Sequence, residues 1–168
     1  PVFYKNRVYV AIGQDPEHGE GVGRLVCVDP KGKKGDITKT GLVWDYKAIH
    51  RSISTVSIDP ETGLLFIADF SGFVHCLDAD TGKVYWVHDM QAHMWGSTFV
   101  VDGKVFCGDE DGDFVCFASS KEKKVLSEVN MGAPIYSTPI VANGAMYVGT
   151  QTHLYVIAEG AKPVTPAK

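Results

Sequence analysis

The feature that most constrains this chain is a repeat with a period of about 40 residues. Residues 65–69 (LFIAD) align with residues 105–109 (VFCGD) and then with residues 146–150 (MYVGT). The apolar segment that follows each of them also recurs, in residues 74–77, 114–117 and 154–157. One sheet cannot bury both of its apolar faces alone, so repeated units of this kind must stack on one another.

Turn signals separate the apolar segments and indicate antiparallel strands. Gly72 and Gly82 supply the positive φ of tight turns, and Asp102-Gly103 and Asn143-Gly144 are strong two-residue hairpin signals. No helical periodicity is present. Four short strands per 40-residue unit are typical of a β-propeller blade.

We therefore predict an all-β fold, a β-propeller of four-stranded antiparallel blades, rather than a β-sandwich, which lacks a regular repeat. About four blades are expected, at approximately 2–48, 49–92, 93–133 and 134–158. The last blade lacks its outer strand, which predicts that the chain is the C-terminal half of an eight-bladed ring. A two-fold homodimer and a closed four-bladed ring are the alternatives. Residues 159–168 are expected to be a disordered tail.

Composition excludes some classes of partner. The formal net charge is −4 and no basic stripe is present, so nucleic acid is not expected as a partner. No apolar run is long enough to span a membrane. The chain shows neither an initiator Met nor a signal peptide, which indicates a mature, processed or truncated chain.

The cysteines follow the repeat. Cys27, Cys76 and Cys116 share one position of the third strand, which indicates packing thiols. If Asp111 and Gly112 form a two-residue turn, Cys107 faces Cys116, a pair that an oxidising compartment would allow to form a disulfide. Without such oxidation both are packing thiols. No zinc-binding spacing is present.

The insertion at residues 13–22 carries three candidate calcium ligands, Asp15, Glu17 and Glu20. Carboxylate oxygens suit calcium, but these residues lack the alternation of a calcium loop. The alternative is a polar, solvent-exposed loop.

One face of the predicted propeller gathers the loops between second and third strands with the connections between blades. Aromatic side chains beside acids and an arginine suit protein binding, because large rigid groups anchor interfaces. Catalytic residues are not predicted, since the sequence shows no recognisable arrangement of a nucleophile with a histidine and an acid. The predicted binding face comprises Arg51, Asp69, Phe70, His93, Trp95, Glu110, Asp111 and Tyr136.

The repeat resembles the PQQ-like (pyrroloquinoline-quinone-like) β-propeller family, including its BamB-like members. The blade pattern, which ends in Leu-Asp-x-x-Thr-Gly-Lys-x-x-Trp, is matched best by residues 77–86 (LDADTGKVYW). The resemblance implies that Trp44 and Trp86 dock between adjacent blades. In the third blade, Leu126 is expected in the place of this tryptophan.

The resemblance implies two functions. BamB-like members are exported bacterial propellers that bind other proteins, so a non-catalytic scaffold in the periplasm, without cofactor, is expected. Its partner would be another protein, the missing half of the propeller or a second copy. Quinoprotein dehydrogenases of the family bind PQQ and calcium, with the cofactor on a disulfide between adjacent cysteines. This chain has no adjacent cysteines, so such a lobe would need cofactor residues outside it.

Overall fold

Fifteen strands and no helix make up the part of the chain that the structure, a computed structural model, describes, residues 1–13 and 21–162. Sheet 1 contains β1 (Val2–Tyr4), β2 (Arg7–Gly13), β3 (Gly23–Val28) and β4 (Leu42–Tyr46). Sheet 2 contains β5 (Ser57–Ile58), β6 (Leu64–Ala68), β7 (Phe73–Asp78) and β8 (Val84–Asp89). Sheet 3 contains β9 (Phe99–Val101), β10 (Lys104–Gly108), β11 (Asp113–Ala118) and β12 (Val125–Asn130). Sheet 4 has three strands, β13 (Ile140–Ala142), β14 (Ala145–Gly149) and β15 (Leu154–Ala158).

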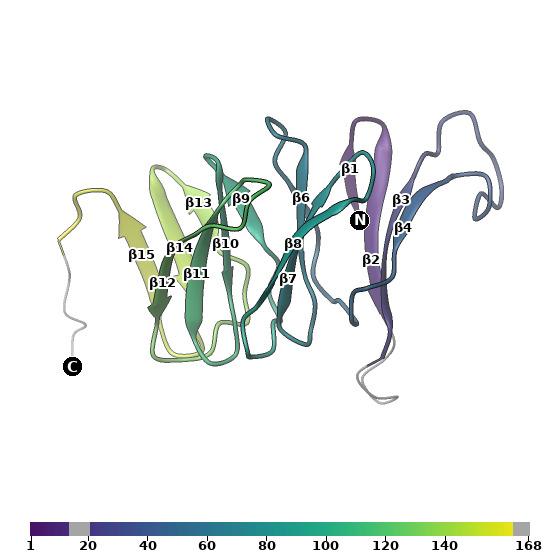
Figure 1. Ribbon diagram of the computed structural model, residues 1–168. Coiled ribbons are helices and arrows are strands. Elements are labelled where there is room, and N and C mark those ends of the chain that lie inside the picture. The colour runs from purple at the N-terminus through teal and green to yellow at the C-terminus, as the bar shows by residue number, and fades with distance from the viewer. Residues whose placement is uncertain (14–20, 163–168) are drawn as a thin grey trace.

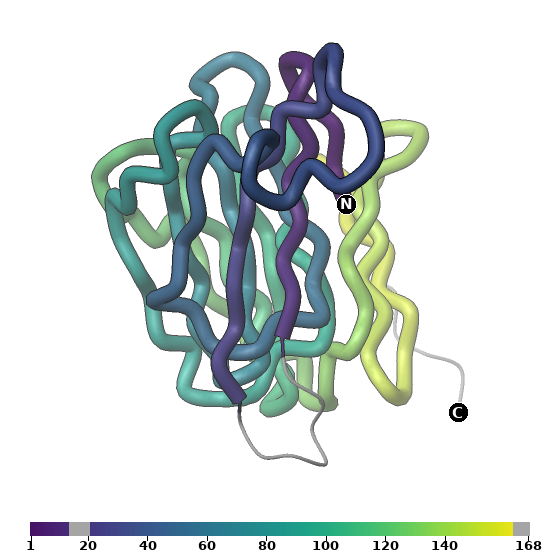
Figure 2. Tube along the Cα trace, turned by 90° about the vertical axis from the view of Figure 1, so that its right-hand side faces the viewer, coloured from purple at the N-terminus to yellow at the C-terminus, as the bar shows by residue number. Residues whose placement is uncertain are grey.

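The sheets stand side by side in chain order, as propeller blades do (Figure 1). Within each sheet, consecutive strands pair antiparallel. Sheets 1 and 4 lie at opposite ends of the row, and Figure 2 shows the row from the side of sheet 1. The described residues therefore form an open row of blades, which confirms the all-β, blade-like prediction. Among the described residues, no helix is long and apolar enough to cross a membrane.

Apolar side chains fill the space between neighbouring sheets. Tyr9 and Leu25 of sheet 1 pack against Leu65 of sheet 2 in one buried cluster. Phe66 of sheet 2 packs with Phe117 of sheet 3 in the next. Strands such as β6 are buried along their whole length because both of their faces are covered. Burial on two faces explains why these strands are apolar without alternation.

Three hairpins have two-residue turns, and two of these turns are the predicted Asp102-Gly103 and Asn143-Gly144. Both central residues have positive φ at Lys5-Asn6 (46° and 62°), Asp102-Gly103 (52° and 67°) and Asn143-Gly144 (51° and 76°). These are type I′ values, whose twist matches that of the flanking strands. The local sequence thus determines these three turns.

Cys107 does not face Cys116, because Asp111 and Gly112 do not form a two-residue turn. Cys107 pairs with Val115, and Cys116 pairs with Phe106, so the two thiols point to opposite faces of sheet 3. The turn contains three residues, because Asp109 N–H bonds the Asp113 carbonyl (3.1 Å) and Gly112 has φ 91°. One extra turn residue shifts the register by one. All four cysteines, at positions 27, 76, 107 and 116, are buried and free.

The first strands of sheets 2, 3 and 4 are shorter than the sequence predicts. The sequence predicts starts at Ser54, Ser97 and Ser137, yet β5, β9 and β13 begin two or three residues later. The preceding hydroxyl groups instead join neighbouring blades: Ser54 Oγ donates to the Gly96 carbonyl (2.7 Å), and Thr55 N–H donates to Ser97 Oγ (2.8 Å). Side-chain hydrogen bonds to the backbone compete with the strand ladder here.

Candidate functional site

The loops at one end of the sheets, the lower end in Figure 1, bring together segments about 40 residues apart in the sequence. The same backbone hydrogen bond recurs at successive blades. Phe70 N–H donates to the Arg51 carbonyl (2.8 Å), and Glu110 N–H donates to the His93 carbonyl (2.9 Å). Each bond ties the β-turn of one blade to the connection that precedes the same blade. The repeat thereby places the loop side chains in a fixed order across the face.

Four rings make one aromatic cluster, defined here as Phe70 of the β6–β7 turn, His93 and Trp95 of the connection between sheets 2 and 3, and Tyr136 of the connection between sheets 3 and 4. Phe70 stacks on His93 with centroids 4.6 Å apart and planes 13° apart. Trp95 meets Phe70 edge-on at 4.9 Å and Tyr136 edge-on at 5.7 Å. These separations and orientations are those that aromatic pairs prefer. The rings therefore support one another.

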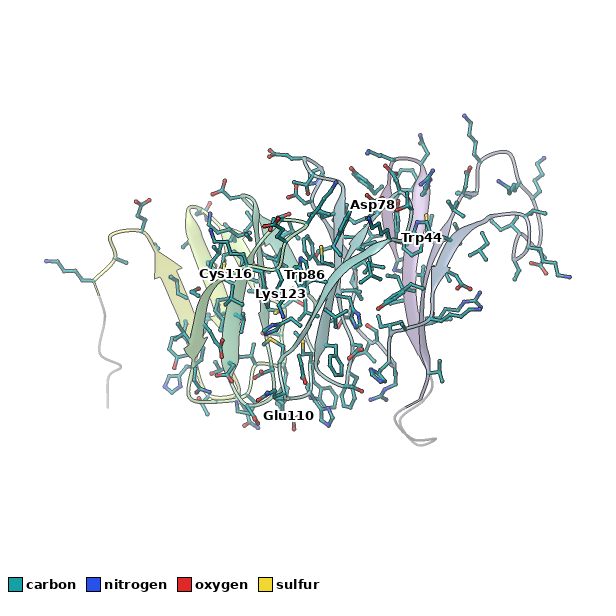
Figure 3. The ribbon with its side chains drawn as sticks, viewed as in Figure 1. Trp44, Asp78, Trp86, Glu110, Cys116 and Lys123 are labelled. Carbon is teal, nitrogen blue, oxygen red and sulfur yellow. The ribbon has the colours of Figure 1, made fainter. Side chains whose placement is uncertain are left out.

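Polar groups hold the cluster in place. Trp95 Nε1 donates to Glu110 Oε2 (3.0 Å), and Glu110 lies at the lower end of the molecule in Figure 3. His93 Nδ1 lies 2.9 Å from the Phe70 carbonyl, and because a carbonyl only accepts, Nδ1 carries the proton. The Arg51 guanidinium lies 4.1 Å from the Phe70 ring centroid, a cation–π distance. Trp95 and Tyr136 are each 44% exposed, whereas Arg51 is 6% exposed.

A cleft of about 250 Å³ adjoins the aromatic cluster. It is lined by Ser71, Gln91, Ala92, His93, Glu110 and Asp111. Asp111 is exposed, and Glu110 is half-buried beneath Trp95. The cluster is thus a partly exposed apolar surface with an acidic rim.

A second arrangement lies deeper, around the Asp69 carboxylate, which is fully buried. Asp69 Oδ2 lies 3.0 Å from His75 Nε2 and 3.1 Å from His50 Nδ1, and Oδ1 accepts the Phe73 N–H (3.1 Å). Tyr46 completes the network, with its hydroxyl 3.1 Å from His75 Nδ1. The network connects sheet 1 through Tyr46 to sheet 2, and it anchors the segment that joins them.

The environment of Asp69 shifts two pKa values. Burial by itself raises the pKa of Asp69, but hydrogen bonds from His75 and from the Phe73 and His50 amides outweigh it and hold the pKa below its usual value. Burial raises the pKa of Tyr46, and the nearby Asp69 charge adds to that rise. Asp69 is therefore a stabilised carboxylate.

Asp109 has the same place in sheet 3 but a different environment. Its Oδ1 accepts the Asp111 and Asp113 N–H groups (3.1 and 2.9 Å), while its buried Oδ2 has no hydrogen-bond partner among the described residues. Val115 stands where sheet 2 has His75. Burial, reinforced by the charges of Asp113 and Asp111, raises the pKa of Asp109. Two equivalent carboxylates thus have opposite shifts.

The structure places the predicted binding residues as follows. Arg51, Phe70, His93, Trp95, Glu110 and Tyr136 belong to the aromatic cluster or contact it directly. Asp111 lines the cleft beside the cluster. Asp69 is fully buried, so its side chain cannot contact a partner at the surface. The calcium candidates Asp15, Glu17 and Glu20 lie outside the described residues.

The network of Tyr46, His75, Asp69 and His50 was not predicted. The sequence does show an aspartate directly after the second strand of sheets 2 and 3. The residues next to Asp69 and Asp109 in the sequence, however, do not indicate which of the two has histidine partners. The partners come from sequence positions up to 23 residues away from Asp69, at Tyr46, so only the folded chain reveals them.

The two tryptophans expected to dock between blades make equivalent contacts (Figure 3). Trp44 Nε1 donates to the Ala79 carbonyl of sheet 2 (3.0 Å), and Trp86 Nε1 donates to the Ser120 carbonyl of sheet 3 (3.0 Å). Gly82 lies against Trp44, because a Cβ there would come within 2.7 Å of the indole. Each indole thus joins its own blade to the next one.

The expectation that Leu126 replaces the tryptophan in sheet 3 is wrong. Trp44 pairs with Cys27, and Trp86 pairs with Cys76. The residue that pairs with the equivalent Cys116 is Ser127. The same one-residue bulge occurs in all three pairings, but Ser127 follows Cys116 by 11 residues whereas Trp86 follows Cys76 by 10, so one extra residue between β11 and β12 displaces the simple alignment.

Four-stranded antiparallel blades packed face to face, with indoles bonded from one blade to the next, define a β-propeller protein of the repeat class. The chain belongs to the family described as "Outer membrane protein assembly factor BamB", whose model matches residues 1–125 and 71–161. Among curated proteins, a quinoprotein ethanol dehydrogenase from Pseudomonas putida is 33% identical over 84 residues, which are 48% of this chain and 13% of that protein.

Solved structures show the same fold. BamB from Moraxella catarrhalis superposes with a TM-score of 0.66 at 14% identity, over 93% of this chain and 41% of that one. A europium-containing methanol dehydrogenase gives a TM-score of 0.59 at 16% identity, over 79% and 23%. The computationally designed Ika4 protein gives 0.66 at 14% identity, over 94% and 88%. The chain therefore spans less than half the length of the natural relatives it matches.

Proposed function

We propose that the chain is a non-catalytic propeller scaffold that binds another protein through the aromatic cluster. The supporting observation is the geometry of that cluster: Trp95 and Tyr136 are held by edge-on ring contacts and by Glu110, yet each remains 44% exposed. Pre-ordered aromatic side chains lose little entropy on binding and are enriched at interface centres. The acidic rim at Glu110 and Asp111 favours a partner that presents Lys or Arg beside an apolar group.

The family supports an extracytoplasmic location for this role. The matching family is described as an outer membrane protein assembly factor, and that description implies work in the cell envelope. We therefore assign the scaffold to the periplasm.

Further blades of the same repeat are the partner that we propose for the two ends of the row. The outward face of sheet 4 carries exposed Ile140, Leu154 and Val156, and sheet 1 exposes Phe3 and Ile12. The same faces of the inner sheets are covered by a neighbouring blade. Light scattering on the purified 168-residue chain distinguishes the two sources: a dimer indicates that a second copy covers these faces. A monomer that binds a hydrophobic dye indicates blades from outside this chain.

A photo-crosslinking experiment tests the binding face. A benzophenone amino acid at position 95 or 136 should crosslink one protein of the cell envelope, whereas the same group at Lys83, on another face, should not. The identified partner is then titrated against Trp95→Ala, Tyr136→Ala and the control Val125→Ala. We expect the first two to weaken binding at least tenfold, about 1.4 kcal/mol each, and the control to leave it unchanged. Equal crosslinking at both faces, or unchanged affinity, would refute the proposal.

The second candidate function is a lobe of a PQQ-dependent dehydrogenase, which the 33% identity with the ethanol dehydrogenase favours. The residues at hand do not fit that cofactor with its calcium ion. Across residues 1–13 and 21–162, no three His, Cys, Asp or Glu side chains converge as metal ligands. The four cysteines are buried, and no two of them are adjacent in the sequence. Equilibrium dialysis with PQQ and calcium tests this candidate, and we expect no retention of PQQ by the chain.

A further inference from the structure

A groove of about 340 Å³ opens between sheets 3 and 4. Its lining includes Asp102 and Gly144 of the β9–β10 and β13–β14 turns, and these turns lie at the upper end of the sheets in Figure 1, opposite to the loops of the aromatic cluster. Apolar side chains dominate its walls, namely Val101 and Phe106 from sheet 3 and Val141, Met146 and Ile157 from sheet 4. Lys104 and Asp102 lie at its rim and bond to each other through Nζ and Oδ2 (3.4 Å). The groove is therefore an apolar opening with one ion pair at its rim, and Glu159 adds a carboxylate to its lining.

The two equivalent interfaces of the molecule each contain an indole. Between sheets 2 and 3, Trp86 packs on Phe66 (centroids 5.8 Å apart) and Phe117 (5.4 Å) and bonds the Ser120 carbonyl. Between sheets 1 and 2, Trp44 packs on Tyr9 (5.9 Å) and bonds the Ala79 carbonyl. An aromatic ring is thus the regular occupant of this position in the repeat.

Sheet 3 supplies no such ring, because Ser127 has the position of the tryptophan. The surroundings of the missing indole are nevertheless present in the groove. Phe106 pairs with Cys116 as Phe66 pairs with Cys76, so Phe106 corresponds to the ring under Trp86. Ile157 pairs with Met146 as Phe117 pairs with Val105, so Ile157 corresponds to the second ring.

The carbonyl acceptor has a counterpart as well. In sheets 2 and 3 the accepting carbonyl belongs to the first or second residue after the third strand, at Ala79 and Ser120. The same place after β15 is held by Glu159 and Gly160, and Glu159 lines the groove. The turn after β15 thus holds the place from which, in sheets 2 and 3, a carbonyl accepts the indole N–H.

We propose that this groove is a binding site for an aromatic side chain of a partner protein, and that the preferred side chain is tryptophan. The ring would lie between Phe106 and Ile157, and its N–H would donate to a carbonyl of the turn after β15. Apolar contact favours any large side chain, whereas the carbonyl selects the indole over an aliphatic group. This site is separate from the aromatic cluster, and it does not depend on the proposed function.

Titration of the ¹⁵N-labelled chain with N-acetyl-tryptophanamide, followed by NMR, tests the proposal. The expected result is saturable shifts confined to the groove, in the amides of residues 101–106, 145–146 and 157–159. N-acetyl-leucinamide should bind at least threefold more weakly. Absence of saturable shifts with the tryptophan probe, or shifts outside the groove only, would overturn the proposal.

Two variants and a control complete the test. Ser127→Trp should fill the groove from within, abolish binding of the probe and raise the melting temperature by roughly 4 °C or more. Ser127→Ala leaves the groove open and should bind the probe as the wild type does. Ile157→Glu introduces a charge at a position that is 45% exposed, so the fold tolerates it while probe binding is lost. Unchanged probe binding in both Ser127→Trp and Ile157→Glu would show that the groove is not the site.

Discussion

The equivalent carboxylates Asp69 and Asp109 predict opposite responses to the same substitution. Both are fully buried, and both follow the second strand of a blade. Asp69 Oδ2 is hydrogen-bonded by His50 and His75, whereas Asp109 Oδ2 has no partner within the described part of the chain. Replacing each by Asn removes the charge and keeps the shape, so the pair separates the effect of charge from that of packing.

We expect Asp69→Asn to lower the free energy of unfolding at pH 7 by about 2–4 kcal/mol, since it weakens charge-assisted hydrogen bonds and leaves buried donors unpaired. Asp109→Asn should instead leave this free energy unchanged or raise it by about 1 kcal/mol, because it removes a buried charge that is only partly compensated. The amide retains an oxygen for the Asp111 and Asp113 N–H groups. The expected difference between the two variants is about 3 kcal/mol.

The pH dependence supplies the second part of this prediction. The pKa of Asp69 is lowered on folding, so its stabilisation is present above the unfolded pKa of about 3.9 and is lost as the pH falls through the folded pKa. The pKa of Asp109 is raised, so its protonated form stabilises the fold below about pH 3.9, and this contribution is lost as the pH rises through the folded pKa. The advantage of Asp109→Asn over the wild type should therefore grow as the pH rises from 4 and then level off.

Urea unfolding followed by tryptophan fluorescence, at several pH values from about 2 to about 8, measures both effects. Wild type and each variant are compared at the same pH, so other titrating groups cancel. The variants share the same type of substitution and the same depth of burial, and each serves as the control for the other. Equal destabilisation by both, with the same dependence on pH, would refute the account of unequal hydrogen bonding.

Three further predictions concern packing, thiols and turns. Trp86→Phe removes the hydrogen bond to the Ser120 carbonyl and part of a buried ring, so urea unfolding should show a loss of about 1–3 kcal/mol; the half-exposed Trp95→Phe is the control, and an equal loss there would contradict the docking role. Burial raises the pKa of the Cys76 thiol to about 12 and raises the pKa of the other three thiols. Ellman's reagent should therefore react slowly with the native chain and with all four thiols in urea, and fewer than four would indicate a disulfide. Gly103→Ala should lower the free energy of unfolding by about 1 kcal/mol, because φ at this position is 67°, which alanine adopts only with strain. A Cβ added there would meet no atom within 4 Å, so no clash adds to this cost. An unchanged urea midpoint would mean that the turn adopts another form.

Local sequence determined the parts of this fold whose requirements are local. Asp102-Gly103 and Asn143-Gly144 specify their hairpins because few other residue pairs adopt two successive positive φ angles. The 40-residue period likewise predicts stacked blades, since a sheet that is apolar on both faces must be covered on both. The loop residues expected to share one face follow from the same period.

Tertiary structure decided what depends on register and on contacts between distant segments. One additional residue in the turn at Gly112 moved Cys107 away from Cys116, because side chains alternate between the faces of a strand. One extra residue between β11 and β12 puts Ser127 opposite Cys116, where the other sheets have tryptophan, and the groove between sheets 3 and 4 lies at the interface that lacks the indole. Asp69 and Asp109 look alike in the sequence, yet the histidines that approach only one of them set opposite pKa shifts. Electrostatic environment is a property of the three-dimensional surroundings, which no local pattern records.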